Sequence, residues 1–426
     1  MFWWMTVFWL GDSAFVFPNV ELDRAVGSYH SPNEPSVAIS LVDRNRIVAG
    51  ANTSNVYVSE DGGKTWKGKQ LKSPHGVWGD PCIVSDTEGH FFYFHLSNPV
   101  SGPWRSRSRL DRIVCQRSQD GGRTWSKGSY TGWRKPFDQD KEWATVDWRN
   151  NTLYVTWTEF DKYESRNKDN RTRIMFSRSS DRGETWSEAK VICDRDGDCR
   201  DGDNTVEGAV PAVGPNGELY VAWALAEKIY FDRSLDAGET WLAKDRVVAE
   251  QPGGWNFKVP GLGRCNGLPV LVSDHGSSPY GGSLYLNWTD QAGGWKDTDV
   301  RLICSRDGGE TWSKPKRVND DPPGRHQFMS WPAVDQTSGY LYVVFYDRRN
   351  YRDYRTDVTL AFSTDGGDSF KNVCISERPF APRKDVFFGN YNNIAAHAGR
   401  IVPIWTRMDH RDTSIWATVI EHDALK

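Results

Sequence analysis

One short phrase occurs six times in this chain, and it constrains the fold more than any other feature of the sequence. Its first copy reads Ser59-x-Asp61-x-Gly63-x-Thr65-Trp66, where x is any residue. The other copies begin at Ser118, Ser179, Ser234, Ser305 and Ser363, and the last of them ends in Phe370 instead of Trp. A recurrence at roughly 60-residue spacing indicates a repeat architecture, in which each repeat is one supersecondary unit.

The chemistry of the phrase is that of a tight turn after a strand. Apolar runs such as 56–58 and 229–231 precede the copies. Asp and Gly tolerate turn conformations, and short polar side chains bond nearby backbone amides. The Trp offers a large apolar surface that can be buried against the neighbouring unit. The phrase therefore predicts a turn between two strands, and we interpret its aspartates as structural rather than catalytic.

The six copies resemble the Asp-box, or BNR repeat, of a family of β-propellers whose best-known members are the sialidases. The resemblance extends from about Asn33 to the C-terminus. It implies an all-β propeller of four-stranded antiparallel blades with Asp-box turns, similar to bacterial exo-α-sialidases, which are glycosyl hydrolases. It implies the fold more strongly than the activity, because the same turn occurs in propellers of unrelated function.

Two further strands become visible in every unit when the chain is aligned on these turns. The first strands often begin at Pro, as in Glu34-Pro35-Ser36 and Asp80-Pro81-Cys82. Pro lacks a backbone N–H and is tolerated at the start of a strand. The second strands, such as 153–157 and 341–345, are rich in aromatic and β-branched residues, a composition typical of half-buried strands.

The C-terminal part of the chain supplies one more unit, which lacks the phrase. Residues 391–396, 401–405 and 414–420 match the first three strands of a unit. The N-terminal residues around 20–26 then provide the missing outer strand and close the ring. We therefore expect seven blades; the alternative is six blades, with the first and last units sharing one.

Residues 18–426 are expected to form one propeller domain, because a propeller builds a single ring from many blades. Residues 1–17 are apolar but lack the basic start of a secretory signal, and Asp12 interrupts the run too early for a membrane span. We interpret this segment as a truncated signal, an expression artefact or an outer strand. The resemblance implies secretion to the extracellular space or the periplasm.

The charge balance argues against a polyanion-binding protein. The chain holds 53 Lys and Arg against 56 Asp and Glu, and no basic cluster stands out. We expect no nucleic acid partner, no membrane span and a monomer. The expected substrate is a glycan or polysaccharide, and no cofactor is required.

The cysteines predict a mixture of core thiols and one bridge. Cys82, Cys115 and Cys304 fall inside strands and are interpreted as inert core residues. Cys199 and Cys265 lie on loops that lead into adjacent first strands, which favours a disulfide between them; Cys193 is the competing partner for Cys199. A disulfide would indicate an oxidising compartment.

An acidic, Gly-containing loop follows the third turn phrase. Clustered carboxylates of this kind can bind Ca²⁺ through oxygen atoms, although the spacing does not match an EF-hand. The alternative is a solvated acidic loop. The candidate ligands of a structural calcium ion are Asp194, Asp196, Asp198 and Asp201, with Asp203 beside them.

Functional residues are expected on the face opposite the turn phrases. The loop that enters each first strand and the loop that leaves each second strand open on that face. These loops carry many carboxylates, arginines and aromatic residues, which together predict a polar-ligand site. They include Glu34, Trp78, Asp80, Asp140, Lys141, Glu142, Glu207, Arg264, Trp331 and Tyr391 before first strands, and His95, Asp347, Arg348 and Arg407 after second strands.

The resemblance to sialidases implies roles for some of these residues. Tyr391 would be the nucleophile and Glu207 its base, with Asp80 or Asp140 as the general acid or base. Arginines would bind the carboxylate of the sugar bidentately. The implied substrate-binding residues are Arg264, Arg348, Arg407, Glu34, Glu142, Trp331 and Asp347.

The chain departs from the family at one place, because Glu34-Pro35-Ser36 stands where sialidases carry an Arg-Ile-Pro motif. Three functions therefore remain. The first is a secreted sialidase-like hydrolase that cleaves a terminal acidic sugar from glycans. The second is a uronate polysaccharide lyase on a seven-bladed propeller, with His95, Tyr391 and Arg407, whose unsaturated products absorb in the ultraviolet. The third is a non-catalytic propeller that binds a glycan or a protein.

Overall fold

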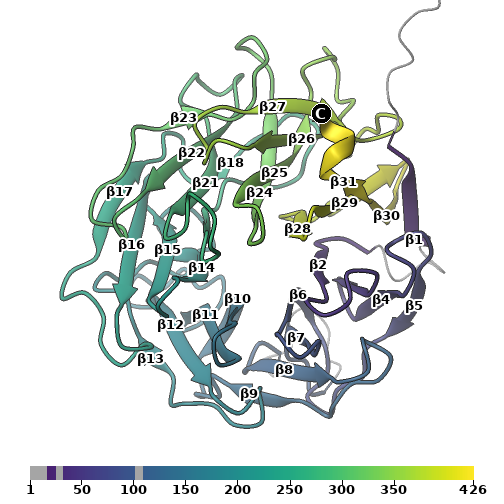
Figure 1. The fold of residues 1–426 in the computed structure, drawn as a ribbon. Helices are drawn as coiled ribbons and strands as arrows, with labels where there is room; N and C mark the ends of the chain where they lie inside the picture. Colours follow the sequence, from purple (N-terminus) through teal and green to yellow (C-terminus); the bar gives the residue numbers. More distant parts are fainter. Residues whose placement is uncertain (1–16, 25–31, 101–108) are drawn as a thin grey trace, which may run out of the picture.

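The computed structural model describes residues 17–24, 32–100 and 109–426 of the 426-residue chain. These residues form a ring of antiparallel sheets around a central axis (Figure 1). Seven sheets of at least four strands are the blades, so the prediction of a seven-bladed all-β propeller is confirmed and the six-bladed alternative is wrong. In this described part of the chain, no helix is long and apolar enough to cross a membrane.

Each of the first six blades takes four consecutive strands, which pair in chain order. The first three blades are β2 (Ser36–Ile39), β3 (Ile47–Ala51), β4 (Asn55–Ser59) and β5 (Lys67–Gln70); β6 (Gly79–Ser85), β7 (Phe91–Leu96), β8 (Ile113–Ser118) and β9 (Ser129–Thr131); and β10 (Asp138–Asp147), β11 (Thr152–Phe160), β12 (Thr172–Ser179) and β13 (Lys190–Val191). The next three are β14 (Glu207–Val213), β15 (Leu219–Leu225), β16 (Lys228–Ser234) and β17 (Arg246–Glu250); β20 (Val270–Ser273), β21 (Leu284–Asp290), β22 (Asp299–Ser305) and β23 (Lys316–Arg317); and β24 (Gln327–Asp335), β25 (Tyr340–Asp347), β26 (Asp357–Ser363) and β27 (Lys371–Cys374). A short hairpin of β18 (Asn256–Phe257) and β19 (Cys265–Asn266) lies between the fourth and fifth blades in the chain.

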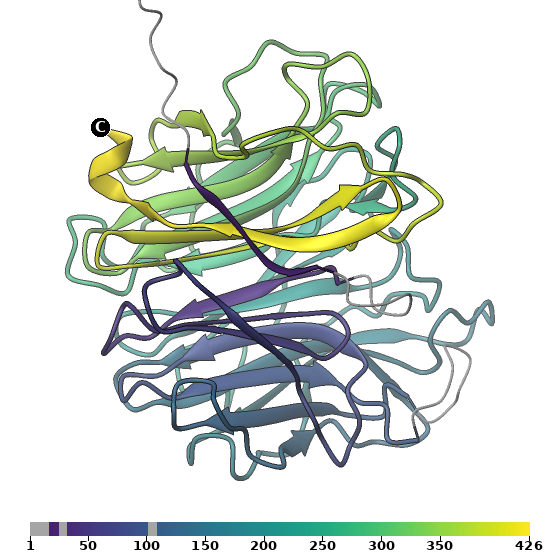
Figure 2. The same ribbon diagram turned by 90° about the vertical axis from the view of Figure 1, so that its right-hand side faces the viewer.

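The seventh blade joins the two ends of the described chain. It consists of β28 (Asn393–His397), β29 (Arg400–Asp409), β30 (Asp412–Thr418) and, as its outer strand, β1 (Asn19–Arg24). The predicted closure of the ring by the N-terminal segment is therefore confirmed, and Figure 2 shows β1 lying along β30. The chain then ends with β31 (Ile420–Glu421), which pairs with β29, and the 3₁₀ helix η1 (His422–Leu425).

Burial explains the sequence pattern of the strands. β7, β11, β15 and β21, the second strands of four blades, are buried at every residue. Because a blade packs against a neighbour on each face, these strands read as continuous apolar and aromatic runs instead of alternating ones. The outer strands β5 and β13 are mostly exposed, and the sequence of β5 contains no large apolar residue.

The turn phrases form the predicted hairpin corners. In the fourth blade, Asp236 accepts hydrogen bonds from the Thr240 amide at 2.8 Å and from the Ser234 hydroxyl at 2.7 Å. The Gly238 amide donates to Ser234 Oγ at 2.8 Å. The phrase ends in Trp241, whose ring lies 5.1 Å from the ring of Phe176 in the preceding blade. The turn therefore closes a hairpin and also contacts the neighbouring blade.

A channel of about 230 Å³ runs along the axis on the side of the turn phrases. A ring of mostly small residues, one from the first strand of each blade, lines it: Ala38, Val84, Thr145, Ala212, Val272, Ala333 and Ala395. Trp143 and Trp331, whose ring centroids are 4.3 Å apart, lie between this channel and the opposite face. The two rings thus form the floor of anything that binds on that opposite face.

The predicted disulfide is wrong, since all seven cysteines are described and free. The Cys199 thiol contacts the carbonyl of Arg171 at 3.1 Å, and Cys265 is buried in β19. Cys82, Cys115 and Cys304 are buried, as predicted for core thiols. The apolar segment 1–17 lies outside the described residues except for Phe17, which is buried.

Candidate functional site

The first strands of several blades share a backbone irregularity at the end that faces away from the turn phrases. β6, β10, β14 and β24 each shift register there. Asp80, Lys141, Gly208 and Met329 lie in these shifts with φ of 52°, 55°, 76° and 50°, and Glu34 before β2 has φ of 53°. Such bulges redirect side chains and are common beside active sites. A left-handed conformation costs a residue with a Cβ about 1–3 kcal/mol, so the fold maintains these positions against strain.

Charged side chains from these irregular segments gather near the axis. We call them, with Tyr391, the axial cluster; its members interact electrostatically with one another. They come from the first four blades, from the loops on either side of the fourth blade, and from the segment before β28. The members are Glu34, Asp80, Asp140, Lys141, Glu142, Asp201, Glu207, Arg264 and Tyr391.

Hydrogen bonds connect the first, second and seventh blades through Glu34. The Asn390 amide donates to Glu34 Oε1 at 2.9 Å, and the Asn52 side-chain amide donates to Glu34 Oε2. Asn52 Oδ1 in turn accepts from the Asp80 amide at 2.7 Å. The carboxyl of Glu34, which is 2% exposed, is therefore fixed in place by neighbouring blades.

Arg264 is held by a carboxylate of the same cluster. Its two terminal nitrogens donate to the two oxygens of Asp201 at 2.7 and 2.8 Å, and the Tyr163 hydroxyl donates to Asp201 Oδ2 at 2.9 Å. Burial alone would lower the pKa of Arg264, but the charges of Asp201 and Glu207 outweigh it and raise that pKa. This guanidinium is a permanent cation whose bidentate position is already occupied.

Tyr391 lies at the centre of the cluster. It is 5% exposed, its ring meets Trp143 edge-on at 5.7 Å, and Lys141 Nζ lies 3.8 Å from its ring centroid. Its hydroxyl has no hydrogen-bond partner among the described residues. Burial raises the pKa of the phenol well above its usual value, and the negative charges of Asp80, Glu34 and Glu142 add to this effect. The predicted partner, Glu207, is not among these charges.

The carboxyls around Tyr391 are tuned toward their protonated forms. Burial, followed by the charge of Asp80, raises the pKa of Glu34 from 4.5 to about 7. Burial also raises the pKa of Asp140, Glu142 and Glu207 well above the ordinary range, and neighbouring carboxylates contribute in each case. Buried acids with raised pKa values are suited to general acid catalysis near neutral pH.

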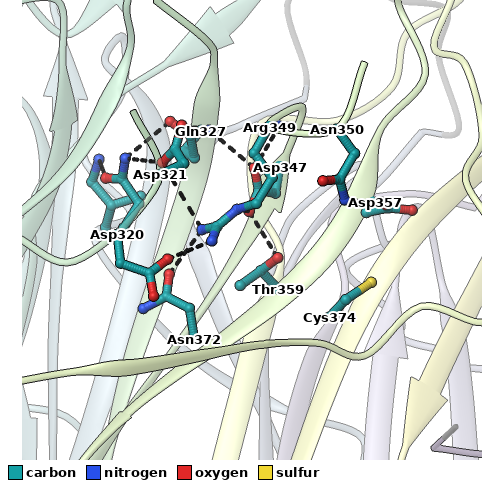
Figure 3. Close-up of polar contacts among 12 residues, drawn as sticks. Asp320, Asp321, Gln327, Asp347, Arg349, Asn350, Asp357, Thr359, Asn372 and Cys374 are labelled. Atoms are coloured by element: carbon teal, nitrogen blue, oxygen red, sulfur yellow. Dashed lines mark hydrogen bonds and ion pairs between the residues drawn. The ribbon is translucent and has the colours of Figure 1, made fainter. Parts of the chain in front are cut away.

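Asp347 and its neighbours form a separate network at the sixth blade, drawn in Figure 3. Asp347 accepts hydrogen bonds from Gln327 at 3.0 Å, Arg349 at 2.6 Å and Thr359 at 2.8 Å. Arg349 also donates to Asn372 at 2.9 Å. These contacts join β24, β25, β26 and β27, so the predicted substrate ligand Asp347 is bound within its own blade.

The other two predicted arginine clamps also have partners outside the axial cluster. Arg348 donates to Thr356 Oγ1 at 3.0 Å and to the Pro260 carbonyl at 2.5 Å, and its guanidinium lies over the Phe328 ring. Arg407 donates twice to Asp409, at 2.8 and 2.9 Å. Of the three predicted clamps, the structure brings only Arg264 into the axial cluster.

His95, which the lyase hypothesis requires, is fully buried in β7. Its two ring nitrogens contact the Leu96 carbonyl at 2.8 Å and the Gln116 side chain at 3.2 Å. Burial lowers its pKa to about 4. Trp331, by contrast, lies beside the axial cluster, with its ring 6.0 Å from that of Tyr391.

Sequence reasoning placed Lys141 on the functional face without a specific role, assigned Asp201 to a different site and did not consider Tyr163. Lys141 could have been recognised by aligning the first strands, since it lies in the same kind of bulge as Asp80. Asp201 was predicted to be a calcium ligand, but its carboxylate binds Arg264 and Tyr163. No sequence signal connects Tyr163 with Asp201, because two loops bring them together.

The carboxylates predicted to bind calcium are not gathered into one cluster among the described residues, and bound calcium stays a prediction. In the described ranges, no group of three or more His, Cys, Asp or Glu side chains is arranged to hold a metal ion. Asp194 faces Asp245, and Thr205 donates to Asp198 at 3.2 Å. Asp194, Asp198 and Asp201 therefore each have different partners.

Comparisons with known proteins agree with the fold. The family model described as the BNR/Asp-box repeat matches residues 303–314, which contain the fifth turn phrase. No curated protein sequence matches the chain. Because the family model covers one repeat, it shows the repeat and leaves the activity open.

Three solved structures illustrate the likeness. A protein of unknown function from Dyadobacter fermentans is 13% identical, with a TM-score of 0.52 and coverage of 95% of this chain and 97% of that one. The NanB sialidase from Streptococcus pneumoniae is 11% identical, with a TM-score of 0.53 and coverage of 89% and 84%. An ulvan lyase, a polysaccharide lyase bound to -[GlcA(1-4)Rha3S]-, is 11% identical, with a TM-score of 0.54 and coverage of 95% and 96%. The chain thus contains an Asp-box repeat and shares its propeller fold with glycan-acting enzymes.

Proposed function

We propose that the protein is a carbohydrate-active enzyme that hydrolyses a glycosidic bond at the axial cluster, with sialidase-like use of a tyrosine. One observation carries this proposal: Glu34, Asp80 and Glu142, from three blades, converge on Tyr391, and the pKa values of all three carboxyls are raised. Paired carboxyl groups are the usual means of glycosidic cleavage. A non-catalytic propeller has no need to bury so many acids in one place.

The positions of the groups suggest their roles. Asp140 is partly exposed and favours its protonated form, so it would donate a proton to the leaving oxygen. The Tyr391 oxygen would attack the anomeric carbon while its proton passes to Glu34, whose pKa of about 7 leaves its carboxyl partly ionised near neutral pH. Water would then attack the same carbon and give its proton to Asp140, while Glu34 returns its proton to Tyr391 and the sugar is released.

The test is turnover by the intact protein and by Tyr391→Phe, with aryl glycosides of acidic, neutral and amino sugars as substrates. We expect Tyr391→Phe to lower kcat by about a hundredfold or more, since the attacking oxygen is lost. Its melting temperature should stay within about 1 °C, because the Tyr391 hydroxyl has no described partner to lose.

A matched control is Tyr346→Phe. The Tyr346 hydroxyl donates to the Thr406 carbonyl and accepts from its amide, each at 3.0 Å, away from the axial cluster. This variant should lose roughly 1–2 kcal/mol of stability and keep its turnover. The reverse pattern, with Tyr391→Phe active, would contradict the proposal.

A uronate lyase is the second outcome that the assay distinguishes. The product of a lyase absorbs in the ultraviolet, and the product of a hydrolase does not. Because His95 is buried with both nitrogens engaged, a lyase would have to use Tyr391 as its base. Absence of turnover on every glycoside and uronate polymer would favour the binding propeller. Secretion stays a prediction from the resemblance.

A further inference from the structure

The axial cluster has an excess of acidic groups. It contains six carboxyls and two cations, Lys141 and Arg264. Arg109 approaches Asp140 from the edge and lies over the rings of Trp78 and Tyr163. One of these cations, Arg264, is already bound by Asp201. The remaining five carboxyls face Lys141, Arg109 at the edge, and the charge of Arg264, which acts on Glu34, Asp80 and Glu207 while its nitrogens bond Asp201. Acidic groups still outnumber the cations.

Some of these carboxyls are buried without a partner. Glu142 is 1% exposed, and neither of its oxygens accepts a hydrogen bond from a described residue; the same holds for Glu207 Oε2. The charges that act most strongly on Glu142 are those of Asp80, Asp140 and Lys141, all members of the cluster. A buried polar group that lacks a partner is costly, and a ligand that supplies a positive donor would remove that cost.

Lys141 shows which chemistry this space accepts. Its ammonium lies 3.8 Å from the centroid of the Tyr391 ring, a cation–π geometry that favours amines. The same ammonium interacts with Glu34, Asp80 and Glu142. The Tyr391 ring and the carboxyls beside it thus already surround one amine of the chain itself, that of Lys141.

We propose that the axial cluster recognises a sugar unit that carries a protonated amine, whose ammonium meets Asp80 and Asp140 above Glu142. The inference rests on the proposed function, because it names the substrate class of the same site. Asp80 and Asp140 are the partly exposed carboxyls of the cluster that no described cation binds directly. A cavity of about 20 Å³ beside Trp143 and Tyr391 has room for a water molecule only, which places the sugar on the outer, exposed side of the cluster.

An acidic sugar fits the same surroundings poorly. Its carboxylate would meet the surplus of acidic groups, and two of the three arginines expected to bind it, Arg348 and Arg407, have partners elsewhere. Like charges at close range disfavour association. An amine would also stabilise the ionised carboxyls, so its binding should release protons, most visibly from Glu34, whose pKa is about 7.

The experiment is calorimetric titration of the full chain with a glucosamine tetramer and with its fully N-acetylated counterpart, at about pH 6, where the amine is protonated. The two probes differ in charge and in the acetyl groups. We expect the amine form to bind about tenfold tighter or more, with proton release measured from the dependence of the heat on the buffer. A sialylated oligosaccharide is the acidic comparison.

Two variants locate the binding. Glu142→Gln and Asp140→Asn should each weaken binding of the amine form by about fivefold to tenfold and leave the acetylated form unchanged. Because Asp140 is partly exposed, we expect Asp140→Asn to fold even if Glu142→Gln does not. Glu184→Gln removes an exposed carboxylate from a turn phrase on the opposite face and should have no effect.

Three other outcomes overturn the inference. Tighter binding of the acetylated or the sialylated probe would show that the site does not select an amine. Amine binding that both variants leave intact would place it outside the axial cluster. Turnover of glycosides without amine preference would retain the proposed function and reject this inference, whereas amine binding without turnover would do the opposite.

Discussion

Glu34, Asp80 and Lys141 carry charged side chains at backbone positions with φ of 53°, 52° and 55°. Glycine would occupy such positions without strain, and Gly208 does so in the fourth blade. The carboxyls of Glu34 and Asp80 act on each other there, and burial raises the pKa of both. Strain and burial at the same residues indicate that the arrangement serves binding or catalysis more than stability.

Glu34 gives a prediction about pH. Its pKa rises from 4.5 to about 7 on folding, because burial and Asp80 disfavour the charged form. The folded protein therefore binds more protons than the unfolded chain between these values, and its stability falls as the pH rises through that window. Glu34→Gln should remove this contribution. Between about pH 4.5 and 7.5, the melting temperature of the variant should therefore fall by roughly 3 °C less than that of the intact protein.

The measurement is a series of thermal melts over that pH range for the intact protein, Glu34→Gln and Glu184→Gln. The last variant loses an exposed carboxylate of the third turn phrase and should keep the slope of the intact protein. A slope that Glu34→Gln leaves unchanged would mean that Glu34 ionises normally in the fold.

The sequence indicated which residues to consider for the axial cluster but not which of them meet. Glu34, Asp80 and Tyr391 could be placed on one face because their distance from a strand start determines the face. Arg348 and Arg407 met the same criterion, yet each is bound by nearby loops, such as the Pro260 carbonyl for Arg348. Loop conformation decides such cases, and no periodic pattern encodes it.

At the scale of elements, the turn phrases do more than close hairpins. Arg178 and Arg233 each precede the serine of one phrase and reach the turn of the next blade. Arg178 donates to the Ala237 carbonyl at 2.6 Å, and Arg233 donates to the Gly308 carbonyl at 2.9 Å. This contact between neighbouring blades was not predicted, because the arginine becomes significant only once the blades are placed side by side.

Asp236→Ala tests the structural role of the phrase. Its hydrogen bonds with Thr240 and Ser234 lower the pKa of Asp236 to about 2. We expect a loss of roughly 1 kcal/mol at neutral pH, with turnover and glycan binding unchanged. Because the pKa is lowered, this stability is present above about pH 4 and should disappear as the pH falls toward 2. Thermal melts at pH 7 and pH 2.5 check the two statements about stability. A loss of turnover in the variant would contradict a purely structural role for the phrase.

At the scale of the whole molecule, the repeat in the sequence predicted the ring, because units that bury both faces against neighbours must close on themselves. The count of seven was correct since the tail unit could be recognised by its strands alone. The predicted disulfide was wrong, because Cys265 lies in a small hairpin and Cys199 faces the carbonyl of Arg171. The lengths and paths of the connecting loops are the part that the repeat does not determine.

Removal of β1 tests the closure of the ring. A chain that begins at residue 25 leaves β30 with an unpaired edge and loses the bond from the Thr418 hydroxyl to the Pro18 carbonyl at 2.9 Å. We expect a melting temperature lower by roughly 5 °C or more and association through the open edge. Thermal melts and size-exclusion chromatography measure both effects. A chain that begins at Phe17 is the control, and equal stability of the two chains would contradict a closing role for β1.

The pairing of β1 with β30 also sets the order of events during synthesis. The ribosome makes β1 first, and its partner lies about 400 residues further along the chain. Six blades can therefore assemble before β30, the partner of β1, has been made. Until then, the first blade lacks the seventh blade as a neighbour on one of its faces. During that interval the strand is free to complete the seventh blade of another nascent chain. Translation speed and the spacing of ribosomes on the message thus become determinants of whether each ring closes on itself.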